Sequence, residues 1–117
     1  MQILHIHAHA GRHDLAGCIE ACSLCHDVCA QTVYQLCLPV GGKYVGAALL
    51  TLMADCAQIC RAAADFMIRG SERHRLACGL CAEICTACAD DCERLGGMDE
   101  CVRACRHCAD FCHALCD

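Results

Sequence analysis

The apolar positions of this chain repeat with the period of an α-helix. In its central and C-terminal parts, Ala, Leu and Cys recur at steps of three and four residues, with Arg, Glu and Asp between them. This pattern is typical of helices that bury one stripe against a core. Strong helix breakers interrupt it at 39–42, at 70–71 and at 96–97. They divide the chain into four segments of similar length.

These segments predict helices over 14–38, 44–69, 72–95 and 100–116. Ser71 and Asp99 are the expected N-caps of the third and fourth helices, because their side-chain oxygens can accept backbone N–H groups. Short connections between helices of comparable length make neighbours antiparallel. The expected fold is therefore all-α, an antiparallel up-down-up-down four-helix bundle forming one domain over 14–117. Residues 1–13, which carry four histidines, are expected to form a separate His-bearing N-terminal tail.

Cysteine content changes this picture, because 17 of the 117 residues are cysteines. They occupy the steps of three and four where a bundle normally places Leu or Ile. The sequence runs are CIEACSLCHDVC, MADCAQIC, CGLCAEICTACADDC and CVRACRHCADFCHALC. The expected core is a column of sulfur atoms contributed by Cys18, Cys22, Cys25, Cys29 and Cys37 of the first helix, Cys56 and Cys60 of the second, Cys78, Cys81, Cys85, Cys88 and Cys92 of the third, and Cys101, Cys105, Cys108, Cys112 and Cys116 of the fourth.

Counting inward from each turn predicts how these stripes align. The expected levels are Cys25, Cys56, Cys85 and Cys108, then Cys22, Cys60, Cys81 and Cys112, with Cys29, Cys88, Cys105 and Met53 on the other side. Cys37 departs from the phase set by Cys29, because the step between them is eight residues.

The odd cysteine number and the N-terminal residues MQILHIHAHAGRHD, which lack the apolar segment of a signal peptide, favour a cytosolic protein with reduced thiols over a secreted disulfide scaffold. No apolar run approaches the roughly 18 residues of a membrane span, so no membrane is expected. A formal net charge of -5 gives no reason to expect nucleic acid.

The size, spacing and charge of the cysteine side chains together indicate which metal the core would hold. Cysteine is smaller than leucine and leaves an underfilled core. The Cβ atoms of successive stripe cysteines are about 5 to 6 Å apart, too far for a disulfide. A metal bound between two sulfurs at about 2.3 Å suits the gap. Buried thiolates need almost equal compensating charge. A monovalent soft ion shared among two-coordinate sites supplies it at about one ion per thiolate, which points to copper(I) and a capacity on the order of 15 to 20 ions.

Met67 and His113 are further candidate ligands, because they are expected at the end where Cys18, Cys78 and Cys116 gather. Copper is expected to enter there. Met53 is either a thioether ligand or a filler of the core. Of the other histidines, His13 and His74 are expected near the same end, whereas His26 and His107 are expected at the surface.

Other functions use similar residues. A metallothionein-like buffer for zinc or soft metals in general remains open, and stoichiometry separates it from copper storage. Iron-sulfur motifs lie in loops that wrap the cluster, unlike these helical stripes. A thiol redox enzyme needs an activated cysteine pair, which no part of the pattern singles out. No catalytic constellation is evident, so no enzyme is expected.

Taken together, CxxxCxxCxxxC over 18–29, DCAQIC followed by ADFMIRGS, and CGLCAEICTACADDCERLGG before CVRACRHCADFC resemble the cysteine-rich four-helix-bundle copper storage proteins of bacteria. The missing export signal favours their cytosolic branch. The resemblance implies copper(I) storage or sequestration with the stripe cysteines as ligands. It also implies a homotetramer, with copper donor or acceptor proteins as possible partners.

Overall fold

The structure, a computed structural model, describes residues 10–116, with side chains from Leu15 onward. Its elements in chain order are α1 (Ala10–Thr32), the π-helical turn η1 (Val33–Cys37), α2 (Leu38–Val40), the 3₁₀ turn η2 (Gly42–Val45), α3 (Ala47–Ile68), α4 (His74–Leu95) and α5 (Asp99–Cys116). Every regular element of this described part is helical, which confirms the all-α prediction. The predicted His-bearing tail falls largely on residues 1–9, outside the described part.

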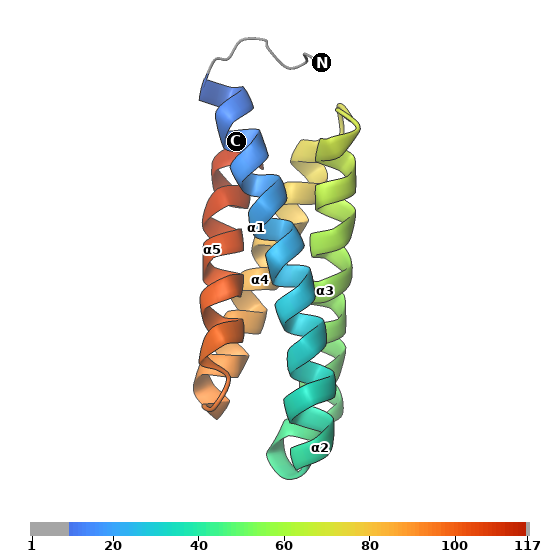
Figure 1. The fold of residues 1–117 in the computed structure, drawn as a ribbon, viewed down its shortest axis with the longest axis vertical. Helices are drawn as coiled ribbons and strands as arrows, with labels where there is room; N and C mark the ends of the chain where they lie inside the picture. The colour runs from blue at the N-terminus through green and yellow to red at the C-terminus, as the bar shows by residue number, and fades with distance from the viewer. Residues whose placement is uncertain (1–9, 117) are drawn as a thin grey trace.

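The four long helices surround one axis. Helix α1 packs against α3 and α5, and α4 packs against the same two neighbours. Figure 1 shows them running alternately down and up, as predicted. The corner at α2 and the α4–α5 turn lie at one end, which we call the loop end. The α3–α4 turn and the last turn of α5 lie at the opposite end, which we call the C-terminal end (Figure 1).

Helix ends lie within a few residues of the predicted positions. Helix α3 begins at Ala47 rather than residue 44, because Gly42–Val45 form the 3₁₀ turn first. It ends in a Schellman motif: Ser71 N–H donates to the Phe66 carbonyl (2.9 Å) and Gly70 N–H to the Met67 carbonyl (3.1 Å). Gly70 has the positive φ of 67° that this motif requires.

Neither of the two predicted residues occupies the N-cap position of its helix. The Ser71 Oγ accepts a hydrogen bond from Arg73 N–H (3.1 Å), so Ser71 caps the turn that leads into α4, whereas α4 itself begins at His74. Asp99 is the first residue of α5, and its carboxylate lies in the first turn, where it suits the helix dipole. The Met98 carbonyl accepts the first helical bond, from Val102 N–H (3.0 Å), so Met98 holds the cap position.

Helix α1 continues through a π turn before it ends. The Leu38 N–H donates to the Val33 carbonyl, five residues earlier. Pro39 follows directly; its ring has no N–H and would clash with a carbonyl one turn earlier in a regular helix. The wider turn also alters the phase of the residues after it, which bears on Cys37 below.

Cysteine and alanine dominate the buried interior. Sixteen of the 17 cysteines are buried and Cys116 is half-buried. Alanines such as Ala63, Ala82 and Ala89 lie beside them, also buried. No charged or polar side chain is buried in the described part of the chain. Small side chains on the inner faces let the helices approach closely, so the sulfurs of facing stripes reach one another.

Helix α3 is long and apolar enough to cross a membrane by length and composition, which the sequence analysis did not recognise. Its inner face nevertheless packs in the bundle through Met53, Cys56 and Cys60. Both α1 and α4 contact it. Only 33% of that apolar window is buried, so packing in the core accounts for part of its apolar character.

The loop end is closed by contacts between the two helical hairpins. The Tyr44 hydroxyl donates to the Gly96 carbonyl (3.0 Å), and Lys43 Nζ donates to the Leu95 carbonyl (2.7 Å). Gly97 has a φ of 81°, and a Cβ added there would collide with the Tyr44 hydroxyl. The η2 turn is thereby fixed over the end of α4.

We expect Gly97→Ala to destabilise the protein more than Gly70→Ala. Both residues have positive φ, which costs an alanine about 1 to 2 kcal/mol, but a Cβ at Gly70 meets nothing within 4 Å. The midpoint of thermal unfolding of the two metal-free variants measures the difference. Equal losses would show that Tyr44 does not pack against Gly97.

Candidate metal centre

Thiol groups from all four long helices converge on the bundle axis. Their Sγ atoms lie 3.5 to 4.0 Å apart across helix pairs, for example Cys22 and Cys108 at 3.5 Å and Cys60 and Cys85 at 3.6 Å. Contacts of this kind run without interruption from Cys18 near the C-terminal end to Cys101 near the loop end. The successive members of one such path are Cys18, Cys112, Cys22, Cys108, Cys60, Cys85, Cys25, Cys29 and Cys101. We call this set of connected thiols the sulfur column.

The predicted levels are correct for α1, α3 and α4 and hold in part for α5. Cys112 lies with Cys22 and Cys81, and Cys105 lies with Cys29 and Cys88, as predicted. Cys105 also contacts Cys25 (3.7 Å). Cys108 contacts Cys60 (3.9 Å) and Cys81 (3.8 Å) and does not join Cys25 and Cys56 in one four-thiol group. The thiols of α5 therefore lie between the predicted levels.

Met53 was also expected at the level of Cys29 and Cys105. The sulfurs gathered there are those of Cys29, Cys88, Cys101 and Cys105. Cys101 holds the place predicted for Met53, whose sulfur lies near Cys37 instead.

The column contains overlapping groups of four thiols suited to metal binding. In each group the sulfurs lie within 4.8 Å of one another. Five such groups are Cys22/Cys81/Cys108/Cys112, Cys60/Cys81/Cys85/Cys108, Cys25/Cys56/Cys60/Cys85, Cys25/Cys29/Cys56/Cys105 and Cys29/Cys88/Cys101/Cys105. Neighbouring groups share members, as Cys60 and Cys85 show. A shared thiolate can bridge two ions, so the geometry favours one extended cluster over isolated sites.

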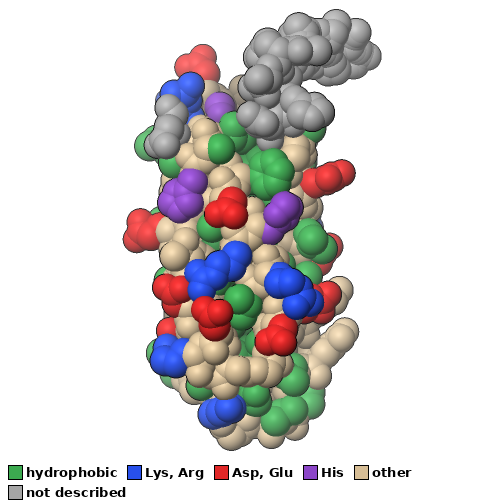
Figure 2. All heavy atoms as spheres, turned by 90° about the vertical axis from the view of Figure 1, so that its left-hand side faces the viewer, with side chains coloured by type: hydrophobic (Ala, Val, Ile, Leu, Met, Phe, Trp, Pro, Cys, Tyr) green, Lys and Arg blue, Asp and Glu red, His purple; other side chains and the backbone are tan. Residues whose placement is uncertain are grey.

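At the C-terminal end, Met67 is buried and its Sδ lies 3.7 Å from Cys78 Sγ. Cys116 Sγ contacts the backbone carbonyl of His113 (3.5 Å), while the His113 side chain is exposed. Figure 2 shows histidine side chains on one face of the molecule, mostly toward this end. The structure thus brings Met67 to the cysteines and leaves the His113 side chain at the surface.

The remaining histidines have structural contacts. His26 Nδ1 is 2.7 Å from the Ala57 carbonyl and links α1 to α3. His74 Nδ1 is 3.0 Å from the Ser71 carbonyl. The His107 ring packs edge-on against Phe111 at a centroid distance of 5.1 Å. The side chain of His13 lies outside the described part.

At the loop end, Cys37 is buried despite its irregular spacing. Eight residues advance a regular α-helix roughly 80° past two full turns. The π turn Val33–Cys37 holds more residues per turn and removes most of this excess. Cys37 Sγ lies 4.0 Å from Met53 Sδ and 4.0 Å from Met98 Sδ. Met98 is a core sulfur that the sequence analysis missed, because it lies between two predicted helices.

The distances between neighbouring Sγ atoms of the column are shorter than a metal ion bound linearly between two sulfurs requires. Two sulfurs on opposite sides of one ion, each bound at about 2.3 Å, would be about 4.6 Å apart. A three-coordinate ion with the same bonds separates its sulfurs by about 4.0 Å. Along the column, neighbouring sulfurs already lie 3.5 to 4.0 Å apart. Metal binding in linear sites must move these thiols apart.

The buried thiols of the core do not ionise as free cysteine does. Burial is the main factor that raises the pKa of Cys37, and the nearby Cys101 adds to it. A hydrogen bond with Cys112 would lower the pKa of Cys78, but the hydrogen bond with Cys18 and burial outweigh it and raise that pKa to about 12.

Hydrogen bonds divide the column into thiols that hold protons and thiols that accept them. The hydrogen bond with Cys101 is the main cause of the raised pKa of Cys105, and it lowers the pKa of Cys101. With no buried cation in the described residues, accumulated thiolate charge would be very costly. We therefore expect most thiols to stay protonated until a metal binds.

Comparisons with known proteins agree with this geometry. The family described as "Csp: Copper storage protein" matches residues 11–117. An uncharacterized cysteine-rich protein of Bacillus subtilis, YhjQ, is 35% identical over 75 residues, which cover 64% of this chain and 68% of that protein.

Two solved structures share the fold. The crystal structure of the Nmul_A1745 protein from Nitrosospira multiformis aligns with a TM-score of 0.88 and 46% identity, over 90% of this chain and 96% of that one. The structure of the Cu(I)-bound copper storage protein BsCsp3 aligns with a TM-score of 0.83 and 30% identity, over 89% of this chain and 99% of that one.

We expect the metal-free protein to lose stability as the pH rises above about 9. An unfolded thiol ionises near pH 9, whereas the folded Cys78 thiol keeps its proton up to about pH 12. Between these values the folded state binds more protons, so the free energy of unfolding falls by about 1.4 kcal/mol per pH unit for each such thiol. Urea unfolding of reduced protein from pH 8 to 11 measures this slope.

Cys78→Ala is the matched variant, because it removes the thiol that causes this dependence. Its slope should be shallower by about 1.4 kcal/mol per pH unit. Stability that does not change from pH 8 to 11 would contradict the expected protonation of the column.

Proposed function

The chain belongs to the copper storage protein family, and on that premise we propose that it stores many copper(I) ions in its sulfur column. The observation that carries this proposal is the uninterrupted series of Sγ contacts through the bundle, from Cys18 to Cys101. Overlapping groups of four thiols support shared, bridging ligands. Copper(I) is the soft ion that thiolates prefer and that balances one thiolate with one charge.

We infer a capacity on the order of 15 to 20 ions per chain from this charge balance. The proposed ligands are the 17 cysteines, together with Met67 and His113 at the C-terminal end. Met67 is supported by its contact with Cys78. His113 is supported by its place next to Cys116, and requires the imidazole to turn inward from the surface.

The family binds and stores metal, and the proposed role is storage without catalysis. The column supplies many similar thiols, whereas a thiol enzyme depends on one or two activated cysteines. The proposed location is the cytosol, because uptake requires free thiols and reducing compartments maintain them.

Copper is proposed to enter at the C-terminal end, where Cys18, Cys78 and Met67 lie near the surface end of the column. The incoming ion displaces thiol protons, because only the thiolate binds the metal. It then passes inward by exchange between neighbouring thiolates, whose sulfurs are at most 4.0 Å apart. Ligand binding to the folded state also raises stability.

A homotetramer is the proposed assembly. Support comes from apolar side chains left partly exposed on the α1–α3 face, where Val33, Leu50, Ala54 and Ala57 line a shallow hollow beside the exposed Tyr34. Association of copies through such a face would bury it. Copper donor or acceptor proteins would then meet the exposed ends of the bundles.

Anaerobic titration of reduced protein with copper(I) against a competing chelator should reach a plateau of about 15 to 20 ions per chain. Zinc should saturate the same protein at far fewer equivalents, because four-thiolate zinc sites accumulate negative charge. A copper plateau at one to four equivalents would end the storage proposal.

Two variants should show whether capacity follows the column rather than the thiol count. Cys25→Ala with Cys105→Ala removes two mutually touching sulfurs and should lower the plateau by about two ions. The matched control, Ser23→Cys, adds a thiol to the exposed face of α1 and should leave the plateau unchanged. A gain of one tightly held ion in that control would contradict the need for a shared core.

We expect Met67→Leu with His113→Ala to slow copper(I) uptake several-fold and change the plateau by at most one or two ions. Both substitutions lie at the proposed point of entry, and Leu replaces Met at nearly equal volume. Stopped-flow transfer from a coloured copper(I) chelator complex measures the rate. The control, Arg94→Ala on the exposed last turn of α4 at the loop end, should leave the rate unchanged. Equal slowing of both would contradict entry at the C-terminal end.

A further inference from the structure

One thiol sulfur and two thioether sulfurs lie close together at the loop end. The Sγ of Cys37 lies 4.0 Å from the Sδ of Met53 and 4.0 Å from the Sδ of Met98. They come from η1, from α3 and from the residue before α5. All are buried, with 0% of Cys37, 0% of Met53 and 3% of Met98 exposed. The fold thus gathers one thiol and two thioethers where the three segments meet.

This cluster differs from the sulfur column in its ligands. The column places thiols against thiols, so each ion there is held by sulfurs that other ions also need. The Cys37 sulfur makes its 4.0 Å contacts with two thioethers, while Cys101 of the column lies farther away. A thioether is neutral and has no proton to lose. A metal held here would be bound singly, with one thiolate and two neutral donors.

The spacing fits a three-coordinate ion. Three sulfurs bound at about 2.3 Å in a plane around one metal are about 4.0 Å apart. Both distances from Cys37 have this value before any metal is present. Cys37 therefore needs no change in its distance to either thioether sulfur in order to share a three-coordinate ion with it, whereas linear sites in the column need longer separations.

Charge and softness select the ion. One thiolate with two neutral thioethers balances a single positive charge, so a monovalent ion leaves the buried site neutral. A divalent ion would leave an excess positive charge in an apolar interior, which is costly. Thioether and thiolate sulfurs together prefer soft monovalent metals such as copper(I) and silver(I).

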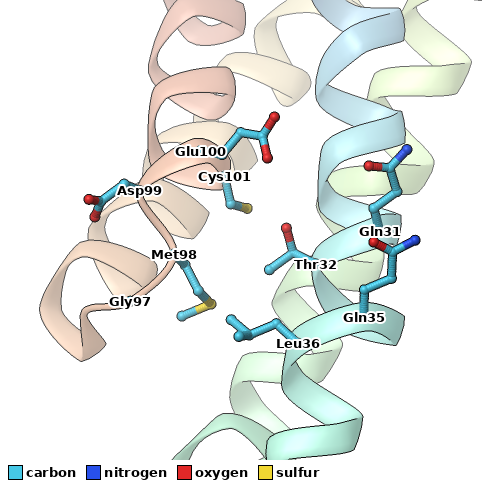
Figure 3. A pocket seen from close by; sticks show the side chains of 9 residues that line it. All are labelled: Gln31, Thr32, Gln35, Leu36, Gly97, Met98, Asp99, Glu100 and Cys101. Atoms are coloured by element: carbon cyan, nitrogen blue, oxygen red, sulfur yellow. The ribbon is translucent and has the colours of Figure 1, made fainter.

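A surface hollow of about 220 Å³ reaches this region from solvent. Figure 3 shows the Met98 side chain and the Cys101 thiol directed into the space between the start of α5 and the helix that carries Gln31, Thr32 and Gln35. Glu100 also lines this hollow, and its negative charge favours the approach of a cation. An ion therefore has a path from solvent to Met98 at the loop end, beside Cys101 at the end of the column.

We propose that Cys37, Met53 and Met98 form a separate mononuclear site for a soft monovalent cation at the loop end, reached through the hollow beside Met98. The cargo is that of the proposed storage function, and the site rests on that function only for the identity of the ion. On binding, the Cys37 thiol releases its proton to solvent and its sulfur forms one bond to the metal. Both thioethers add as neutral donors, and no group is oxidised or reduced.

Methionine methyl NMR tests this site directly. Protein labelled with ¹³C at the methionine methyl groups is titrated anaerobically with copper(I), which is diamagnetic. The methyl signals of Met53 and Met98 should shift together, over the same equivalents, because one ion binds both sulfurs. Cys37→Ala should abolish both shifts. The matched control, Met67→Leu, should leave them unchanged, because Met67 lies at the other end of the bundle.

A second measurement does not depend on a cysteine variant that could unfold. Met53→Leu with Met98→Leu keeps the side-chain volumes nearly constant, and helical circular dichroism verifies the fold. This pair should lower the copper(I) plateau by one ion. Adding Met67→Leu to the pair then shows whether the lost ion belongs to the loop end or to the C-terminal end. Silver(I) should shift the same two methyl signals in the unsubstituted protein.

The site is refuted if the Met53 and Met98 methyl signals stay in place while the column fills, and the two sulfurs are then core packing. Such a result leaves a plateau of about 15 to 20 ions, so the storage function would stand without the site. Failure of storage itself has a different signature, a plateau of one to four ions. Shifts of Met53 and Met98 that survive Cys37→Ala would also overturn the three-sulfur arrangement.

Discussion

The fold depends on bringing many ionisable sulfurs together in an interior that offers them no counter-charge. No charged side chain is buried in the described residues, so the metal-free column is tolerable only while its thiols keep most of their protons. Protons and metal ions therefore compete for the same sulfurs. This competition connects stability to uptake, because whatever removes protons from the column must supply an equal positive charge.

The helical phase of the cysteines allowed most of the fold and of the sulfur-lined core to be predicted from the sequence. Steps of three and four on four segments place the cysteines on one face whatever the exact helix ends are, so the bundle and its sulfur-lined core followed. The exact register of α5 did not follow: Cys105 shares a level with Cys29 as predicted, but it also lies beside Cys25. Register depends on the path of the turn through Gly96 and Gly97, which have φ near 80°, and residue counting does not include that path.

Sequence reasoning also failed where the helix departs from 3.6 residues per turn. The step from Cys29 to Cys37 is out of phase in a regular helix, and the π turn before Pro39 brings Cys37 back to the core. Met98 was missed for a related reason, since a methionine between a glycine turn and a helix start has no periodic neighbours. Both residues lie at the loop end, where local backbone geometry sets which sulfurs meet.

The metal-free column is packed, and this limits how it can fill. Its sulfurs touch at 3.5 to 4.0 Å, whereas linear metal bridges need about 4.6 Å. Each ion that enters must rotate cysteine side chains or separate helices, and the small Ala63, Ala82 and Ala89 beside the column give little side-chain bulk that resists such shifts. An ion bound at one level moves sulfurs that also belong to the next, because Cys60 and Cys85 are shared between groups. Filling should therefore spread between neighbouring levels rather than proceed independently at each, since the first opening lowers the cost of the second.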